Sequence, residues 1–179
     1  MAKFLSYFIG TIVLLAVSLA TFMYFQLGFY KEPRVLGAQQ INLNLIYKQQ
    51  LGPYHEISPL LSKIEAEIAG QNIDCAIPFG EYLDDPASMD PERLRSNLGC
   101  VIESDKVPLI DGFTTEKREG NYLVIEFEGS PGIGPYKAYP EADNWFQQQG
   151  KPRPATAIET YKPTGDGELL TTYYFKVEG

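Results

Sequence analysis

The chain has 179 residues, which is enough for one domain. Its formal net charge is −8, and residues 35–179 alone carry 12 basic and 22 acidic side chains, a net charge of −10. Such an acidic surface repels phosphate backbones, and the sequence holds no nucleic-acid-binding motif, so we expect no direct binding of DNA or RNA. The same charge favours cationic or neutral ligands over anions.

The N-terminal segment 4–30 is predominantly apolar and contains no charged residue. Its length suffices to cross a bilayer, and aromatic residues gather toward both of its ends, as they do at membrane interfaces. The alternative is a cleaved signal peptide with its cleavage site at Ser18-Leu19-Ala20, but the apolar run continues well beyond Ala20. We therefore predict an uncleaved, single-pass membrane anchor over 4–30.

The side of the membrane is weakly determined by the flanking charges. Lys3 precedes the anchor, and Lys31 and Arg34 follow it. By the positive-inside rule this difference slightly favours a cytoplasmic position for the rest of the chain. Residues 31–38 read as a linker, and residues 39–179 as one soluble domain.

The first half of this domain begins with a strand, because apolar residues alternate over 41–47. Ser58 and the proline after it are typical of a helix start, and apolar residues at helical spacing continue to a C-terminal cap at Gly70. Segments 75–83 and 98–102 then predict a pair of strands.

The same order recurs in the second half. Residues 122–128 alternate as a strand, and Gly134-Pro135-Tyr136 repeats the earlier turn of the same sequence at Gly52-Pro53-Tyr54. A helix ending near Gly150 follows, and a closing hairpin covers 155–177. Two strand-helix-strand-strand halves predict an α+β fold in which one antiparallel sheet carries two helices on one face. The junction of such halves is a favoured place for a ligand cleft.

Two segments of the first half resemble the signature of GyrI-like small-molecule-binding domains, within the SOUL and multidrug-regulator superfamily. They are 78–86 (PFGEYLDDP) and 94–99 (LRSNLG). The turn at 52–54 and the strand at 158–161 (IETY) are similar to two shorter motifs of that family. The anchor is similar to a eukaryotic reticulophagy-receptor branch of the family, but no disordered tail follows Gly179, so we do not expect the receptor role to carry over.

The resemblance implies that Glu159 faces the cleft and meets a cationic or aromatic ligand. Glu159 and Tyr161 alternate onto one face of a strand, and Gly80 takes the equivalent place in the first half. A solvated glutamate, or one bridged to a lysine, is the alternative. Trp145 lies on the apolar face of the second helix, where it can line the cleft or pack in the core. Further aromatic candidates for the cleft are Tyr54, Tyr82, Tyr136, Phe79 and Tyr122.

Neither the acidic residues nor the cysteines follow the sequence pattern of a metal-binding site. Asp84, Asp85 and Asp90 fit a turn with capping carboxylates better than a calcium loop, and we expect Arg95 to pin that loop to one of them. We expect no metal or other cofactor. Cys75 and Cys100 can pair or remain two reduced thiols, and the sequence leaves both open.

Three hypotheses of function follow. The first is a membrane-tethered module that binds a small amphipathic or cationic molecule between its two halves. The second is a hydrolase of small hydrophobic electrophiles, an activity that the resemblance implies for stand-alone members, with Glu159 as base and no other catalytic residue assigned. The third is an adaptor at the membrane whose protein partner is unknown.

Overall fold

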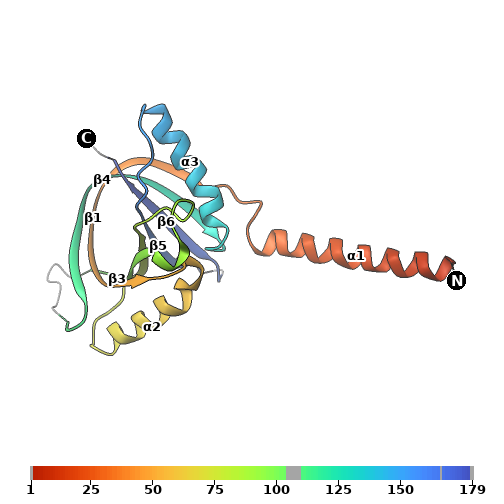
Figure 1. Cartoon of the computed structure of the whole chain (residues 1–179), viewed down its shortest axis with the longest axis horizontal. Coiled ribbons are helices and arrows are strands. Elements are labelled where there is room, and N and C mark those ends of the chain that lie inside the picture. Colours follow the sequence, from red (N-terminus) through yellow and green to blue (C-terminus); the bar gives the residue numbers. More distant parts are fainter. Residues whose placement is uncertain (1, 104–109, 166, 178–179) are drawn as a thin grey trace.

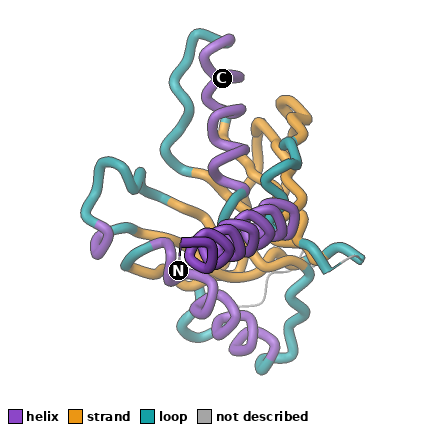
Figure 2. Tube along the Cα trace, turned by 90° about the vertical axis from the view of Figure 1, so that its right-hand side faces the viewer, coloured by secondary structure: helices purple, strands orange, loops and turns teal. Residues whose placement is uncertain are grey.

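The computed structural model describes residues 2–103, 110–165 and 167–177 (Figure 1). Helix α1 (Ala2–Gln26) extends away from the rest of the chain, and Figure 2 looks along it onto the domain. The stretch Ser6–Gln26 is long and apolar enough to span a membrane, and none of it is buried in the structure.

The domain consists of six strands and two long helices in the described part of the chain. In chain order these are β1 (Arg34–Leu51), α2 (Ile57–Ala69), β2 (Ile77–Tyr82), β3 (Arg95–Ile102), β4 (Thr114–Gly129), α3 (Gly134–Gln148), β5 (Ala157–Pro163) and β6 (Leu169–Lys176). Short 3₁₀ turns at Tyr54–Glu56 and Pro91–Arg93 precede α2 and β3. The strands are antiparallel and close into a barrel in the order β1-β3-β2-β5-β6-β4.

The structure confirms the α+β class, the antiparallel strands and the two domain helices, and it adds the closure of the barrel. Closure depends on two strands that are longer than predicted. β1 starts at Arg34, inside the predicted linker, and β4 starts at Thr114, well before the predicted strand 122–128. β1 therefore pairs with β4 along 34–47 and with β3 along 44–51, which joins the first and last strands of the sheet.

Successive side chains of each strand point to opposite faces of the barrel. One apolar cluster lies inside, because it joins strands that are not neighbours; its members are Leu45, Tyr47, Phe79, Val101, Tyr122 and Ile158. Both helices pack on the outer face, α2 over β1 and β3, and α3 over β4 and β6 (Figures 1 and 2). Strands β2 and β5 lie between these two helix-covered regions in the strand order.

Cys75 and Cys100 form a disulfide that ties the segment after α2 to β3. Their Cα atoms lie 5.2 Å apart, within the usual range for a disulfide. The sequence left this pairing open, because it depends on how α2 returns the chain to the sheet.

Replacing Cys75 by serine is expected to lower the free energy of unfolding by about 3 kcal/mol, because the bond closes a loop of 25 residues. Urea unfolding of the full chain in detergent micelles measures this change. Reduction of the unmodified chain should produce the same loss, and an unchanged midpoint after reduction would contradict the prediction.

Candidate functional site

Glu159 lies on the outer face of the barrel, between the strands that α2 covers and those that α3 covers. It is on β5, where it pairs with Gly80 of β2 on one side and Tyr173 of β6 on the other. The side chains of Tyr82 and Tyr161, two residues further along β2 and β5, lie on the same face. This row of residues lies between the strands that α2 covers and those that α3 covers.

The carboxyl group of Glu159 is enclosed by tyrosine hydroxyls. The Tyr139 hydroxyl from α3 donates a hydrogen bond to Oε1 at 3.0 Å, and the Tyr161 hydroxyl donates to Oε2 at 3.2 Å. A further hydrogen bond of 2.8 Å joins the hydroxyls of Tyr82 and Tyr161. Glu159 itself is only 4% exposed.

Burial raises the pKa of Glu159 from 4.5 to about 7, and the hydrogen bonds from Tyr139 and Tyr161 oppose this rise. In the described part of the chain, no basic side chain contributes to this pKa shift. Burial and the Glu159 charge also raise the pKa values of Tyr82, Tyr139 and Tyr161, so these phenols stay protonated and available as donors. The site therefore offers a carboxylate that is hydrogen-bonded but has no counter-ion within residues 2–103, 110–165 and 167–177.

A second buried glutamate, Glu81, shows the opposite arrangement. It lies on the inner face of β2, where the Arg118 guanidinium donates to both of its oxygens at 3.1 and 3.0 Å. The Asn97 side chain donates to it as well, at 2.6 Å. A buried carboxylate is ordinarily held by such a partner, and the contrast marks Glu159 as the exception in this fold.

Aromatic rings form the wall around Glu159. The rings of Tyr54 and Tyr82 meet edge to face with centroids 4.8 Å apart, and Tyr139 meets Tyr173 and Phe175 in the same way, at 6.1 and 5.2 Å. Gly134, in the first turn of α3, is needed here, because a Cβ at this position would lie 2.0 Å from the Tyr173 hydroxyl oxygen. The faces of aromatic rings carry partial negative charge, which attracts organic cations.

One cation already rests on this wall from outside. The Arg153 guanidinium carbon lies 4.8 Å from the Tyr139 ring centroid and 5.6 Å from that of Phe175, and its Nε donates to Asp143 at 2.8 Å. An open depression of about 500 Å³ adjoins it, lined by Asp143, Gln147, Gly150, Lys151, Pro152 and Arg153. Tyr139 thus carries a cation on its ring and hydrogen-bonds Glu159 through its hydroxyl.

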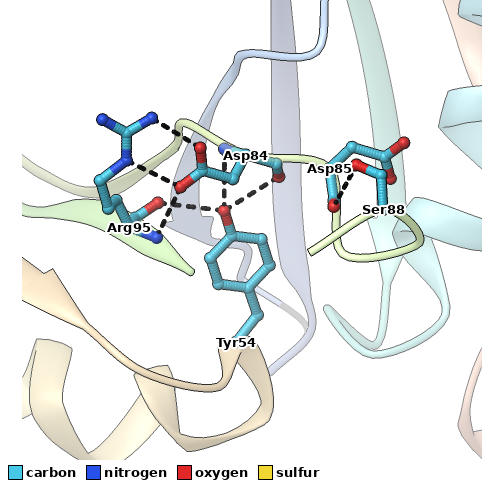
Figure 3. A network of polar contacts seen from close by, with 5 residues as sticks. All are labelled: Tyr54, Asp84, Asp85, Ser88 and Arg95. Carbon is cyan, nitrogen blue, oxygen red and sulfur yellow. Dashed lines mark hydrogen bonds and ion pairs between the residues drawn. The ribbon is translucent and has the colours of Figure 1, made fainter. Parts of the chain in front are cut away.

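The loop after β2 holds the side chain of Tyr54, one of the aromatic rings around Glu159, in place (Figure 3). Arg95 donates to the Asp84 carboxylate from Nε at 2.9 Å, from its second guanidinium nitrogen at 2.6 Å and from its backbone N–H at 2.8 Å. The Tyr54 hydroxyl lies 3.0 Å from the carbonyl oxygens of both residues and accepts from the Asp84 N–H at 3.1 Å. This confirms the predicted contact of Arg95, and Arg95 holds the pKa of Asp84 below its usual value.

The other two aspartates of this loop cap turns. Asp85 accepts from the Ala87 N–H at 2.9 Å, and Asp90 accepts from the Glu92 N–H at 3.0 Å. Both bonds satisfy local backbone donors, as the turn interpretation of the sequence expected.

The structure brings together only some of the predicted site residues. Glu159, Tyr161, Tyr82 and Tyr54 form the cluster described above. Phe79 and Tyr122 lie inside the barrel, on the opposite face. Trp145 packs against the apolar cluster that α3 forms with β4 and β6, and its ring lies 5.0 Å from that of Phe146. Tyr136 is 80% exposed on the first turn of α3. We leave these four out of the proposed site.

Two residues of the cluster, Tyr139 and Tyr173, were not among the predicted ones. Tyr139 could have been found from the sequence, because it shares a helix face with Ala142 and Phe146. Tyr173 carries no such signal, since its place beside Glu159 depends on the β5–β6 register.

Residues 41–178 match the profile of the GyrI-like small molecule binding domain, which spans nearly the whole domain described above. The chain belongs to the GyrI-like family. This confirms the resemblance seen in the sequence and a ligand-binding role for the GyrI-like domain. The likeness to the reticulophagy-receptor branch stays a hypothesis.

Two solved structures share the GyrI-like fold. The crystal structure of the EcmrR C-terminal domain superposes with a TM-score of 0.56 at 13% sequence identity, covering 82% of this chain and 98% of that one. A cryo-EM structure of an EcmrR–DNA complex gives a TM-score of 0.60 at 15% identity, covering 96% of this chain and 69% of that one. At these identities the likeness shows the fold alone, so the DNA belongs to that complex only. No curated protein matches the sequence significantly.

Proposed function

We propose that this GyrI-like protein is tethered to a membrane by α1 and binds a small amphipathic organic cation against Glu159. The observation that carries the proposal is a buried carboxylate that lies within the tyrosine cluster and has no basic partner among the residues that the structure describes. Burying an ionised carboxylate without a counter-ion is unfavourable, and a bound cation supplies the missing charge. Aromatic rings around the carboxylate favour a large, weakly hydrated cation over a metal ion.

The arrangement of β2 and β5 supports a site between two related halves. Gly80 and Glu159 are direct partners across these antiparallel strands, and the tyrosines two residues beyond each, Tyr82 and Tyr161, meet through their hydroxyls. A Cβ on Gly80 would lie 3.3 Å from the Tyr82 ring, so the glycine leaves room for that ring beside the strand. One half supplies a carboxylate and the other supplies space. The two halves would therefore form one site, which does not lie on the pseudo-twofold axis that relates them.

Binding is expected to change the fluorescence of Trp145, the only tryptophan in the chain, because it packs beside the same cluster as Tyr139. The full chain in detergent micelles is titrated with tetraphenylphosphonium and with a neutral triphenyl compound of similar size. We expect saturable quenching by the cation only, weakened at least about tenfold in Glu159→Gln. Equal responses to both compounds, or to both proteins, would argue against the proposal.

Hydrolysis is the second candidate, and the pKa of Glu159 favours it specifically. A carboxyl group that titrates near pH 7 suits general acid–base catalysis at neutral pH. A screen of small electrophiles tests this activity. Turnover that disappears in Glu159→Gln, while the variant remains folded, would support the hydrolase.

The Cys75–Cys100 disulfide is evidence for the side of the membrane on which the domain lies. Disulfides persist in oxidising compartments and are rare in the cytosol, so the bond favours a non-cytoplasmic domain over the cytoplasmic position that the flanking charges slightly favoured. We propose that the domain lies on the oxidising side. A thiol-reactive polymer added to denatured whole-cell extracts should label the chain only after reduction; labelling without reduction would place the domain in the cytosol.

A further inference from the structure

The segment between α1 and β1 is held against the domain by ion pairs. Lys31 pairs with Glu168 and, at 3.6 Å, with Glu128. The next residue, Glu32, pairs with Lys137 of α3 at 3.1 Å. The hydrogen bond to Glu168 raises the pKa of Lys31, so this cation stays charged at neutral pH.

Backbone contacts strengthen the same junction. The Ser130 N–H donates to the Leu27 carbonyl at 3.4 Å, and a Cβ on Gly28 would lie 3.4 Å from the Cα of Gly129. Gly28 adopts a φ of +77°, a conformation that suits glycine, and turns the chain at the end of α1. The junction therefore fixes the direction in which α1 leaves the domain.

This geometry places the end of β4 and the start of α3 beside the end of α1, as Figure 1 shows. Tyr136, in the first turn of α3, is 80% exposed, more than any other large apolar side chain that the structure describes in the domain. Its neighbour Lys137 is the residue that pairs with Glu32. An aromatic ring so exposed has no role in the core of the domain.

Further exposed apolar side chains lie along the chain on both sides of the ion-paired segment. Phe29 and Tyr30 precede it with 40% and 49% exposure, and Val35 and Leu36 follow it with 40% and 37%. The charges between them are neutralised within the protein, by Glu168, Lys137 and, for Arg34, Glu126. Aromatic and apolar side chains with paired charges suit the interfacial region of a bilayer.

We propose that this patch (Phe29, Tyr30, Val35, Leu36 and Tyr136) rests in the interface of the bilayer, so that the domain is held in one orientation against the lipid. The partner is the lipid surface itself, because Phe29 and Tyr30 follow shortly after α1 and the ion pair of Glu32 with Lys137 brings the first turn of α3 to the same junction. The inference rests on the proposed membrane span of α1. Since Tyr139 lies one helical turn after Tyr136, the helix that hydrogen-bonds Glu159 starts at the lipid surface.

The test uses the full chain in phosphatidylcholine nanodiscs whose acyl chains carry bromine, a short-range quencher of tryptophan. Trp145→Phe supplies a background without tryptophan. In it, Tyr136→Trp is compared with Gln148→Trp, an exposed position about 18 Å further along the same helix. We expect brominated lipid to remove most of the fluorescence of Tyr136→Trp and little of that of Gln148→Trp, whereas iodide in water should quench them in the reverse order.

Two further variants separate the causes of failure. Phe22→Trp, within α1, reports whether the helix itself spans the bilayer. Quenching of Phe22→Trp together with equal quenching of Tyr136→Trp and Gln148→Trp would overturn the proposed contact and leave the anchor intact. Absence of quenching in Phe22→Trp would overturn both. In Lys31→Ala, quenching of Tyr136→Trp should decrease, because the junction loses its ion pairs.

Discussion

Replacing Glu159 by glutamine is expected to stabilise the folded protein by about 3 kcal/mol at pH 8 and to change its stability little at pH 4. The reason is the burial of the carboxyl group, which raises its pKa from 4.5 to about 7 on folding. A tenfold change in an acid dissociation constant corresponds to about 1.4 kcal/mol. A mutation that increases stability would mark Glu159 as a residue retained for function.

The direction of the pH effect depends on whether the folded protein stabilises the protonated or the ionised form of the Glu159 carboxyl group. The folded state favours protonated Glu159. The contribution of Glu159 to the free energy of unfolding is therefore fully present below about pH 4.5 and is lost as the pH rises through about 7. Glutamine does not titrate, and the difference between the two proteins should therefore grow from near zero at pH 4 to its full size at pH 8.

Urea unfolding of the full chain at several pH values measures this difference. Glu92→Gln is the matched control, because it makes the same chemical change at an exposed position. A Glu159→Gln protein that is less stable than the original at pH 8 would mean that the carboxylate is stabilised in the fold and would remove the argument for a missing cation.

Gly99→Ala is expected to lower the free energy of unfolding by more than about 3 kcal/mol or to prevent folding. Gly99 lies on β3 opposite Tyr47 of β1, and a Cβ there would lie 1.9 Å from the Ile46 carbonyl oxygen and 2.7 Å from the Tyr47 Cα. Both are backbone atoms, so relief requires β1 and β3 to separate. The apolar side chains of α2 pack on this strand pair, against Ile46 and Leu98, and this packing would be lost when the strands separate.

Thermal unfolding followed by circular dichroism measures the effect of Gly99→Ala on the full chain. Gly165→Ala is the control, because a Cβ at Gly165 meets no atom within 4 Å and its φ is not positive. Equal melting temperatures for the two variants would contradict the close approach of β1 and β3.

The sequence predicted the middle of every strand, by alternation of apolar residues in 41–47 and 122–128 and by hairpin and turn signals elsewhere, but not the ends of β1 and β4. The first half of β4, Thr114–Asn121, consists of polar residues and one glycine, so no apolar period marks it. It becomes a strand because it pairs with β1, and Arg118 is drawn inside the barrel by Glu81 and Glu116. Such pairing is a tertiary effect, which is why the closed barrel could not be predicted from local pattern.

The candidate site was predictable along one strand and not across strands. Period two placed Glu159 and Tyr161 on one face, and the resemblance indicated that the face carries a ligand. Which tyrosines complete the cluster depends on the register of β6 and on the side of α3 that meets the sheet. The signature phenylalanine, Phe79, illustrates the limit, because its position next to Gly80 places it on the opposite face of β2.

The central claim is that Glu159 is the counter-ion of a bound organic cation. Calorimetric titration of the full chain with tetraphenylphosphonium, in buffers of different ionisation enthalpy, measures the protons released on binding. With a pKa of about 7, Glu159 is mostly protonated at pH 6, so binding should release about 0.9 proton at pH 6, about 0.1 at pH 8, and none in Glu159→Gln. Tight binding without proton release at pH 6, or equal affinity in Glu159→Gln, would contradict the claim.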